Sequence, residues 1–351
     1  MEERLLNLSN EKLEELNNFI DMNLRNRKRD SDYRLLHSIS GMMSQGIKIG
    51  DRYIKENDRQ FSMEKTREIV LNFYKELDSE LFEKVNNIVS GNSSFEFRMY
   101  RYDENEDFSK VGEDGFPIHK KSGSVESHDG KSVIYVPCKG NLDDIYLLAH
   151  ELSHTFDFID DGSWTRNLMG EVTPYCIEAM LGKYLVEKGI ITEKEAAERE
   201  KRDIVSRFDD GVETFAKLEL MRIKERQKDI KQEDISEVQR SFNLKNEQLD
   251  FIIGRMMRGE TNVDYRARYM IAQLVYPHYM EEYEKNPQEA IKRFKEYFNQ
   301  VKDNNFEGSL KTLGIEPTME SVSHLIDKNN RRIEKIEKAR HHEKDGFEDI
   351  D

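Results

Sequence analysis

Most of this chain consists of long amphipathic stretches that contain no proline. Its 351 residues include only 6 prolines and 19 glycines, and a proline inside a helix removes a backbone hydrogen bond and clashes with the preceding turn. Between residues 62 and 90 the apolar side chains recur with the helical period, which predicts one long helix that ends at Gly91. Helices are also expected over residues 1–28 and from 141 to 340.

Residues that favour strands are concentrated in one place. The segments FEFRMYRY and SVIYVP, within residues 95–137, are rich in β-branched and aromatic side chains, and turn residues separate them. No other part of the sequence has this character. We therefore predict an α+β fold that is mostly helical and contains one small sheet.

The balance of charge excludes several classes of protein. There are 55 basic and 70 acidic residues, a net charge of −15, and an acidic surface repels the phosphate groups that drive nucleic-acid binding. No apolar run approaches the roughly 20 residues that cross a membrane, and the polar N-terminal residues lack the pattern of a signal peptide. Cys138 and Cys176 are too few for a disulfide framework and are expected to be free buried thiols. These features predict a cytoplasmic protein that binds neither nucleic acid nor membranes.

The segment AHELSH, residues 149–154, contains the pattern HExxH. Residues four apart share one helical face, so His150 and His154 can present imidazole nitrogens to a single Zn²⁺. Glu151 lies beside them, where it can accept a proton from a water that the metal polarises. The apolar flanks predict a buried helix, which favours a metal site over two histidines on a surface helix.

A catalytic zinc site needs a third protein ligand and an open position for water. Asp160 stands where the ligand of a metzincin-like motif would be, but that motif requires a glycine where this sequence has Asp157, so we reject it. The segment GEVTPYCIEAML supplies Glu171 and Glu178, two helical turns apart on one face. One of them can ligate the metal while the other orients a ligand. Pro174 is tolerated only in a first turn, which places Glu171 at the start of this helix, near the metal.

The segment SVIYVPCKGNLDDIYLLAHELSHTFD resembles the active-site segment of the thimet oligopeptidase and oligoendopeptidase F family of zinc metallopeptidases, which are gluzincins. In that family a strand ends in a G-x-L-D-D-like turn, and the helix with the two histidines follows directly. EVTPYCIE is similar to a family segment with two glutamates, the first of which is the third zinc ligand. The resemblance implies a zincin-like catalytic domain in which His150, His154 and Glu171 hold one Zn²⁺ per chain. It implies that Glu178 orients one of these metal ligands without itself binding the zinc.

The resemblance also implies a tyrosine that stabilises the transition state. The segment DYRARYMIAQ, residues 264–273, is similar to the family's Y-x-x-x-Y helix, which points to Tyr265 first and Tyr269 second. A phenol on this face can donate to the oxygen that becomes negative at the cleaved carbonyl. Two core tyrosines on an amphipathic helix would give the same pattern, and His278 and Tyr279 are the next candidates.

The chain departs from the family at several positions. Ser153 stands where glycine is usual within HExxH, Asp157 where a further histidine is common, and Glu260 where the family has a histidine before the first tyrosine. The resemblance covers roughly residues 60–340. Members commonly carry a large N-terminal helical lobe that restricts substrates to short peptides, and here only about 60 residues stand before the resembling part.

These features predict a zinc-dependent oligoendopeptidase that hydrolyses internal bonds of a peptide or protein substrate, with Glu151 as the general base. The strand from Ser132 to Val136 is expected to lie at the edge of the sheet and to pair with the extended substrate. Two alternatives stay open: a peptidase dedicated to a single protein target, and a non-catalytic binding protein that kept the zincin fold. A binding protein has no need of Glu151, which argues against the second. The sequence sets neither the cleavage preference nor the oligomeric state.

We divide the chain into three parts. Residues 1–58 are an N-terminal helical segment, residues 59–343 the zinc metallopeptidase catalytic domain, and residues 344–351 an acidic tail. The run from 196 to 240 is crowded with charges of both signs, which predicts an exposed helix with ion pairs between residues four apart.

Overall fold

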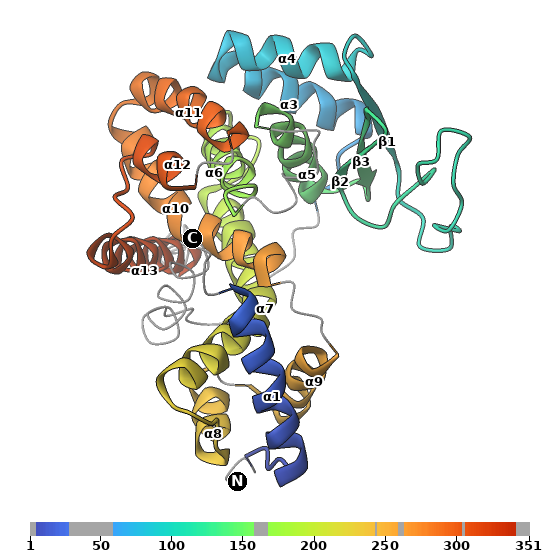
Figure 1. Cartoon of the computed structure of the whole chain (residues 1–351). Coiled ribbons are helices and arrows are strands. Elements are labelled where there is room, and N and C mark those ends of the chain that lie inside the picture. Colours follow the sequence, from blue (N-terminus) through green and yellow to red (C-terminus); the bar gives the residue numbers. More distant parts are fainter. Residues whose placement is uncertain are drawn as a thin grey trace, which may run out of the picture.

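The computed structural model describes residues 5–27, 59–157, 168–242, 244–258, 263–303 and 306–341 (Figure 1), with the side chains of 23–27, 209–210, 263–266 and 319 left out. The strands are β1 (Phe95–Arg101), β2 (Ser124–His128) and β3 (Lys131–Cys138). The helices are α1 (Asn10–Arg27), α3 (Met63–Leu77), α4 (Ser79–Val89), α5 (Leu142–Ser153), the 3₁₀ turn η1 (His154–Phe156), α6 (Val172–Glu187), α7 (Glu193–Arg226), α8 (Gln232–Ser241), α9 (Asn246–Met257), α10 (Val263–Lys285), α11 (Pro287–Lys302), α12 (Phe306–Thr312) and α13 (Met319–His341). The predicted fold class, mostly helical with one small sheet, is confirmed.

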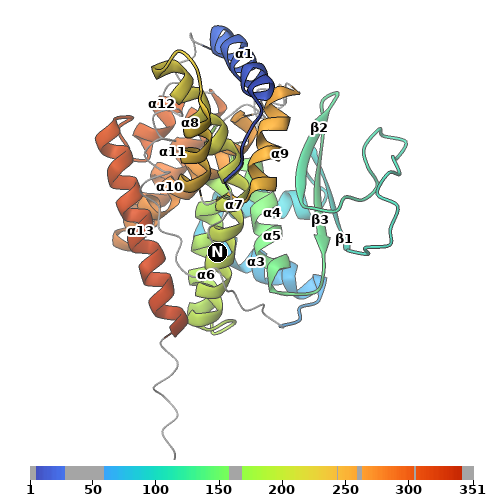
Figure 2. The same cartoon turned by 90° about the horizontal axis from the view of Figure 1, so that it is seen from below.

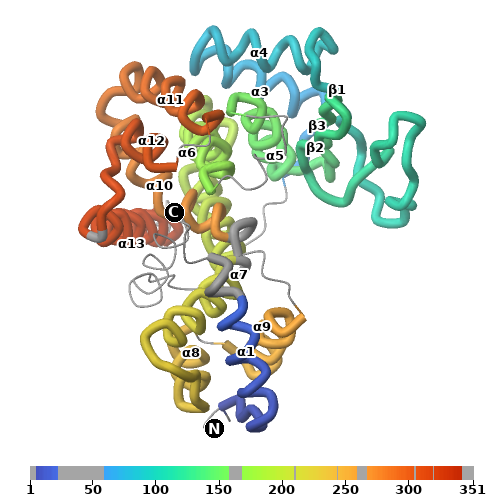
Figure 3. The backbone as a smooth tube through the Cα atoms, viewed as in Figure 1, coloured from blue at the N-terminus to red at the C-terminus, as the bar shows by residue number. Residues whose placement is uncertain are grey.

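The helix α7 joins two regions of the molecule. In one region the sheet and α3–α5 lie on one side of α6 and α7, while α13 lies on the other (Figures 1 and 2). In the second region α1, α8 and α9 surround the C-terminal end of α7. The backbone tube shows the segment between β1 and β2 extending away from the rest of the chain (Figure 3).

The sheet has the order β1-β3-β2, so β3 lies in its centre. β1 pairs with β3 in parallel and β2 pairs with it in antiparallel fashion, through a turn in which Asp129 and Gly130 both have positive φ. The prediction that Ser132 to Val136 forms an edge strand is therefore wrong. Seven consecutive residues of β3 are buried, as in a strand that is covered on both faces. The two outer edges of the sheet, which are formed by β1 and β2, are the ones that a further strand could join.

The predicted single helix over residues 62–90 is interrupted at Asp78. This residue has an extended backbone, and its carboxylate accepts hydrogen bonds from the backbone N–H groups of Glu80 and Leu81, at 3.0 and 3.1 Å. Asp78 thereby ends α3 and caps α4, because a side-chain acceptor satisfies the free N–H groups of a new first turn. Gly91, at φ 73°, ends α4 as predicted.

A capped turn sets the direction in which α5 leaves the sheet. After β3 the chain turns at Gly140, with φ 87°, and Asn141 caps α5 in a capping box with Asp144. The buried Asp144 carboxylate accepts from the backbone N–H groups of Lys139, Gly140 and Asn141, at 2.9, 2.6 and 3.2 Å. The sequence KGNLDD thus fixes the start of the helix that carries His150 and ends just before His154.

The helix α7 is not the exposed helix predicted for the charged run 196–240. Its N-terminal half packs against α6, α10 and α13, its C-terminal half contacts α1, α8 and α9, and much of it is buried. The charges that this packing buries are paired: Lys201 lies 2.5 Å from Glu337, and Lys217 lies 2.7 Å from Glu213. The high density of charged residues therefore did not mean that the helix is exposed, because oppositely charged partners neutralise these side chains inside the fold.

The N-terminal helix α1 is tied to the region around the end of α7. The Asn17 amide donates to the carbonyl of Ile230 at 3.1 Å, and its oxygen accepts from the Ile230 N–H at 2.8 Å and from Lys224 Nζ at 3.0 Å. Leu16 and Ile20 are fully buried beside it. The predicted boundary at residue 58 stays a prediction, since residues 28–58 lie outside the described ranges.

Cys138, at the end of β3, and Cys176, in α6, are buried and free, as predicted. Burial raises the pKa of the Cys138 thiol to about 12 and that of Cys176 well above its usual value. Both thiols therefore stay protonated and inert at neutral pH. Among the described residues no helix is long and apolar enough to cross a membrane.

The neighbouring asparagines of α1 test how tightly this helix is held. We expect Asn17→Ala to lower the free energy of unfolding by about 1–3 kcal/mol, because it leaves buried partners without hydrogen bonds. Asn18→Ala, at an exposed position, is the matched control and should change it little. Urea denaturation measures both, and equal effects would show that α1 is not anchored through Asn17.

Candidate metal centre

The ends of α5 and α6 bring three side chains together. His150 lies near the end of α5, His154 directly after it, and Glu171 immediately before α6. Glu171 Oε2 is 3.5 Å from His150 Nε2 and 4.0 Å from His154 Nε2. One ligand atom from each residue lies within 4.8 Å of the others. The structure therefore gathers the set named from the sequence into one cluster that can hold a metal ion.

The donor atoms in this cluster fit a zinc ion. The Oε2 atoms of Glu171 and Glu151 are buried and accept no hydrogen bond from any described residue, and a buried polar atom without a hydrogen bond is unfavourable. Two imidazole nitrogens and one carboxylate oxygen form a donor set found in catalytic zinc sites, which leave a position open for water. A divalent cation would satisfy the carboxylate of Glu171 and replace the missing hydrogen bonds.

Glu151 projects into the same place from the next position of α5. Its side chain is 4% exposed, and burial, together with the charges of Glu171 and Glu178, raises its pKa to about 7. A Cβ atom at Gly123, just before β2, would overlap the Glu151 carboxylate and the side chain of Leu147. A glycine at 123 is thus what allows the start of β2 to approach Glu151 so closely.

Glu178 contacts His150 from the side away from the cluster. Its Oε1 is 2.5 Å from His150 Nδ1, and because an ionised carboxylate only accepts, Nδ1 carries the proton and donates. In the neutral ring, that proton position leaves the lone pair of Nε2 directed toward Glu171 and His154. Burial would raise the pKa of Glu178, but Arg207 and His150 outweigh it and lower the pKa to about 2. Without a metal, burial lowers the pKa of His150, and the hydrogen bond and charge of Glu178 reverse this and raise it to about 9.

A buried arginine of α10 adjoins the cluster on its other side. Arg268 Nε lies 3.3 Å from Glu171 Oε1. Burial raises the pKa of Glu171, and the positive charge of Arg268 opposes that rise. Arg268 therefore helps to keep Glu171 in the ionised form that a metal requires.

Three solved peptidase structures share this fold. One is described as an oligoendopeptidase F of Bacillus anthracis str. Ames, with 13% identity and a TM-score of 0.57 over 92% of this chain and 60% of that one. PZ peptidase A with an inhibitor has 12% identity and a TM-score of 0.58 over 87% and 59%. A protein described as a peptidase of Chlamydophila abortus has 11% identity and a TM-score of 0.50 over 94% and 56%. No family model matches the sequence, and no curated protein does.

The chain has a zincin-like peptidase fold. At these identities the likeness concerns the fold alone. The chain spans less than two thirds of the length of each of the three proteins. The resemblance noted from the sequence is therefore supported at the level of the fold, and what the cluster does is argued from its own residues.

The candidate tyrosines lie on α10, which passes the cluster. Tyr265 belongs to this helix, but its side chain is outside the described residues. Tyr269 is partly buried, with the guanidinium of Arg268 5.4 Å from its ring centroid. His278 lies 3.0 Å from the Leu313 carbonyl through Nε2, and Tyr279 packs in the core. His278 and Tyr279 therefore belong to the packing of α10 rather than to the cluster of His150, His154 and Glu171.

The departures from the family pattern have structural roles here. Ser153 donates to the carbonyl of His150 at 2.7 Å. Asp157 is fully buried and accepts a hydrogen bond from Thr173 of α6, which ties the chain after His154 to the helix that follows Glu171. Asp160, Trp164 and Glu260 lie outside the described residues.

Sequence reasoning missed Arg207, Arg268 and Gly123. The residues Arg199, Asp203 and Arg207 recur every four positions, which indicates one charged face of α7 but not that this face is buried. Nothing in the sequence linked Arg268 to Glu171 or Gly123 to Glu151, because each pair joins elements far apart along the chain.

Zinc binding tests the cluster directly. We expect the metal-free protein to bind one Zn²⁺ per chain, and Glu171→Gln to weaken that binding more than Glu178→Gln, which should cost about 10–100-fold. Competition with a chromophoric chelator measures all three. Glu193→Gln, at an exposed position at the start of α7, should bind like the unmodified chain. The reverse order of Glu171 and Glu178 would exchange their roles.

Proposed function

We propose that this protein is a zinc-dependent peptidase that hydrolyses internal bonds of a peptide or protein substrate. The observation that carries the proposal is the cluster of His150, His154 and Glu171, with Glu151 close enough to feel their charges, in a fold shared with peptidases. Each residue has the chemistry that the reaction requires. The family resemblance of the sequence supports the same conclusion.

His150, His154 and Glu171 would hold the zinc, which when bound supplies a Lewis acid and makes water acidic enough to ionise near neutral pH. Glu151 would accept the proton of the attacking water and deliver it to the departing amine. A base that also serves as an acid works best with a pKa near the working pH, and in the metal-free protein burial raises the pKa of Glu151 toward that range. Glu178 would keep His150 in the tautomer that binds a metal.

The outer edge of β2 is the proposed place for the substrate backbone. β3 cannot serve because both its edges are paired, whereas β2 begins beside Gly123, against Glu151. An extended peptide that adds to β2 as a further strand would bring its carbonyl groups past the general base. The close approach at Gly123 supports this arrangement.

Tyr265 is the proposed donor to the negative oxygen of the transition state, with Tyr269 as the second candidate. The proximity of Arg268 to Glu171 supports the choice of α10, since it brings this helix to the cluster. Cleavage of intact proteins alongside short peptides separates a general oligopeptidase from a peptidase dedicated to one protein.

Glu151→Gln tests the general base. We expect it to leave zinc binding intact and to lower turnover of a mixed quenched-fluorescent peptide library by at least about a hundredfold, because an amide cannot accept the proton. The zinc content of each preparation is the control. If turnover survives the substitution, Glu151 is not the general base. If the zinc-loaded unmodified protein cleaves neither peptides nor proteins, a binding protein is favoured.

Gly123→Ala tests the contact between β2 and Glu151. The added methyl group should displace the Glu151 carboxylate, so we expect kcat to fall at least about tenfold while zinc stays bound. Ser122→Ala, at the exposed preceding position, is the matched control. If Gly123→Ala keeps full activity, the start of β2 does not constrain Glu151.

A further inference from the structure

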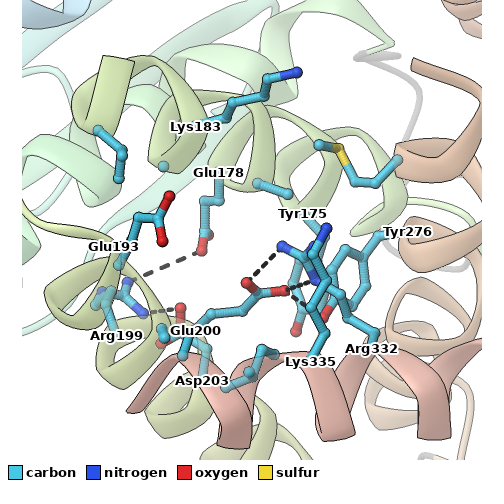
Figure 4. Close-up of a pocket in the computed structure, with 18 of the residues that line it drawn as sticks. Tyr175, Glu178, Lys183, Glu193, Arg199, Glu200, Asp203, Tyr276, Arg332 and Lys335 are labelled. Atoms are coloured by element: carbon cyan, nitrogen blue, oxygen red, sulfur yellow. Dashed lines mark hydrogen bonds and ion pairs between the residues drawn. The ribbon is translucent and has the colours of Figure 1, made fainter. Parts of the chain in front are cut away.

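A cavity lies behind the metal cluster, on the far side of Glu178. It has a volume of about 380 Å³ and is enclosed by α6, α7, α10 and α13 (Figure 4). Both acidic and basic side chains line it, and Figure 4 shows Glu178 reaching into it from α6. The carboxylate of Glu178 therefore has His150 on one side and this cavity on the other.

One guanidinium in the cavity holds the second oxygen of that carboxylate. Arg207 Nη2 donates to Glu178 Oε2 at 2.9 Å, while Oε1 accepts from His150. The centre of the same guanidinium lies 3.2 Å from the ring centroid of Tyr175. Arg207 is thus fixed by a hydrogen bond in its plane and by an aromatic ring on its face, an arrangement that arginine can make and lysine cannot.

The other guanidinium near Glu178 has different partners. Arg199 Nη2 is 3.9 Å from Glu178 Oε2, too far for a hydrogen bond. Arg199 pairs with Asp203 one turn along α7, and its Nε lies 2.9 Å from Asp143. Arg199 contributes positive charge near Glu178, but only Arg207 fixes the direction of its carboxylate.

We propose that Arg207 is a positioning residue for the metal centre: it orients Glu178, and Glu178 in turn orients His150 toward the metal. The inference rests on the proposed function, since it assumes that His150 is a zinc ligand. With Oε2 held by Arg207, the carboxylate cannot rotate Oε1 away from His150 Nδ1. Substituting a residue that hydrogen-bonds to a metal ligand commonly lowers metal affinity 10–100-fold. Glu178 is such a residue here, and Arg207 supports it in turn.

The cavity also supplies a matched control. Arg332 donates to both oxygens of Glu200, at 2.7 and 2.7 Å, and Glu200 accepts from Tyr276 at 2.9 Å (Figure 4). This is a second arginine–carboxylate pair in the same cavity, and its carboxylate contacts no metal-cluster residue. Removing Arg332 disturbs the charge and packing of the cavity without touching Glu178.

Cobalt binding is the experiment, because Co²⁺ reports both affinity and ligand geometry through its visible spectrum. Metal-free samples of the full chain are titrated with Co²⁺ and then with competing Zn²⁺. We expect Arg207→Ala to weaken binding about tenfold and to alter the Co²⁺ spectrum, while Arg332→Ala changes neither. In a Glu178→Gln background, Arg207→Ala should have little further effect, because the residue through which it acts is already changed.

Small guanidinium compounds add a readout that a purely structural role would not give. The space left by Arg207→Ala opens into the existing cavity, so millimolar guanidinium should restore part of the affinity and of the Co²⁺ spectrum. If Arg207→Ala does not fold, Arg207→Lys is used in its place, with an intermediate loss expected.

Three outcomes are decisive. Equal effects of Arg207→Ala and Arg332→Ala would overturn the inference and leave the zinc site standing. Additive effects of Arg207→Ala and Glu178→Gln would do the same. Failure of the unmodified chain to bind either metal would overturn both the inference and the proposed function.

Discussion

The carboxylates of Glu151, Glu171 and Glu178 are all buried beside His150 and His154. Burying one charge without a partner disfavours folding by several kcal/mol, so the surrounding structure must compensate three. Arg207 and His150 stabilise Glu178, and Arg268 lies against Glu171. Glu151 has no comparable partner among the described residues that surround it, and its pKa rises to about 7 as a result. Of these three carboxylates, Glu151 has no arginine beside it among the described residues, and it is also the one to which the proposed mechanism gives the proton transfer.

The compensation comes from helices that are distant in sequence. α7 supplies Arg207 and α10 supplies Arg268, and both pack on α6, which begins after Glu171. Gly211 in α7 allows the close approach of α10, because a Cβ atom there would overlap Met270. The contacts that pack these three helices together are therefore the same contacts that balance the charge of the cluster.

Local chemistry explains what the sequence predicted. The spacing of His150 and His154, and the limit that Pro174 sets on the start of α6, are consequences of helix geometry within a few residues. Partners that meet only through tertiary packing were not predictable. One such case is the contact between Arg207 and the ring of Tyr175. Another is the central position of β3 in the sheet, because its apolar sequence would also suit an edge strand. Asp78 was overlooked because a residue that caps a helix also occurs on helix surfaces.

The length of α7 has a consequence for how the chain comes apart. At about 1.5 Å per residue, its 34 residues span roughly 50 Å, from the cavity behind the metal cluster to the hydrogen bonds around Asn17. Hydrogen bonding along one helix is cooperative, so the two regions share a backbone that melts as a unit rather than a hinge that lets them open separately. We therefore expect an ion held at one end to slow amide exchange at the other.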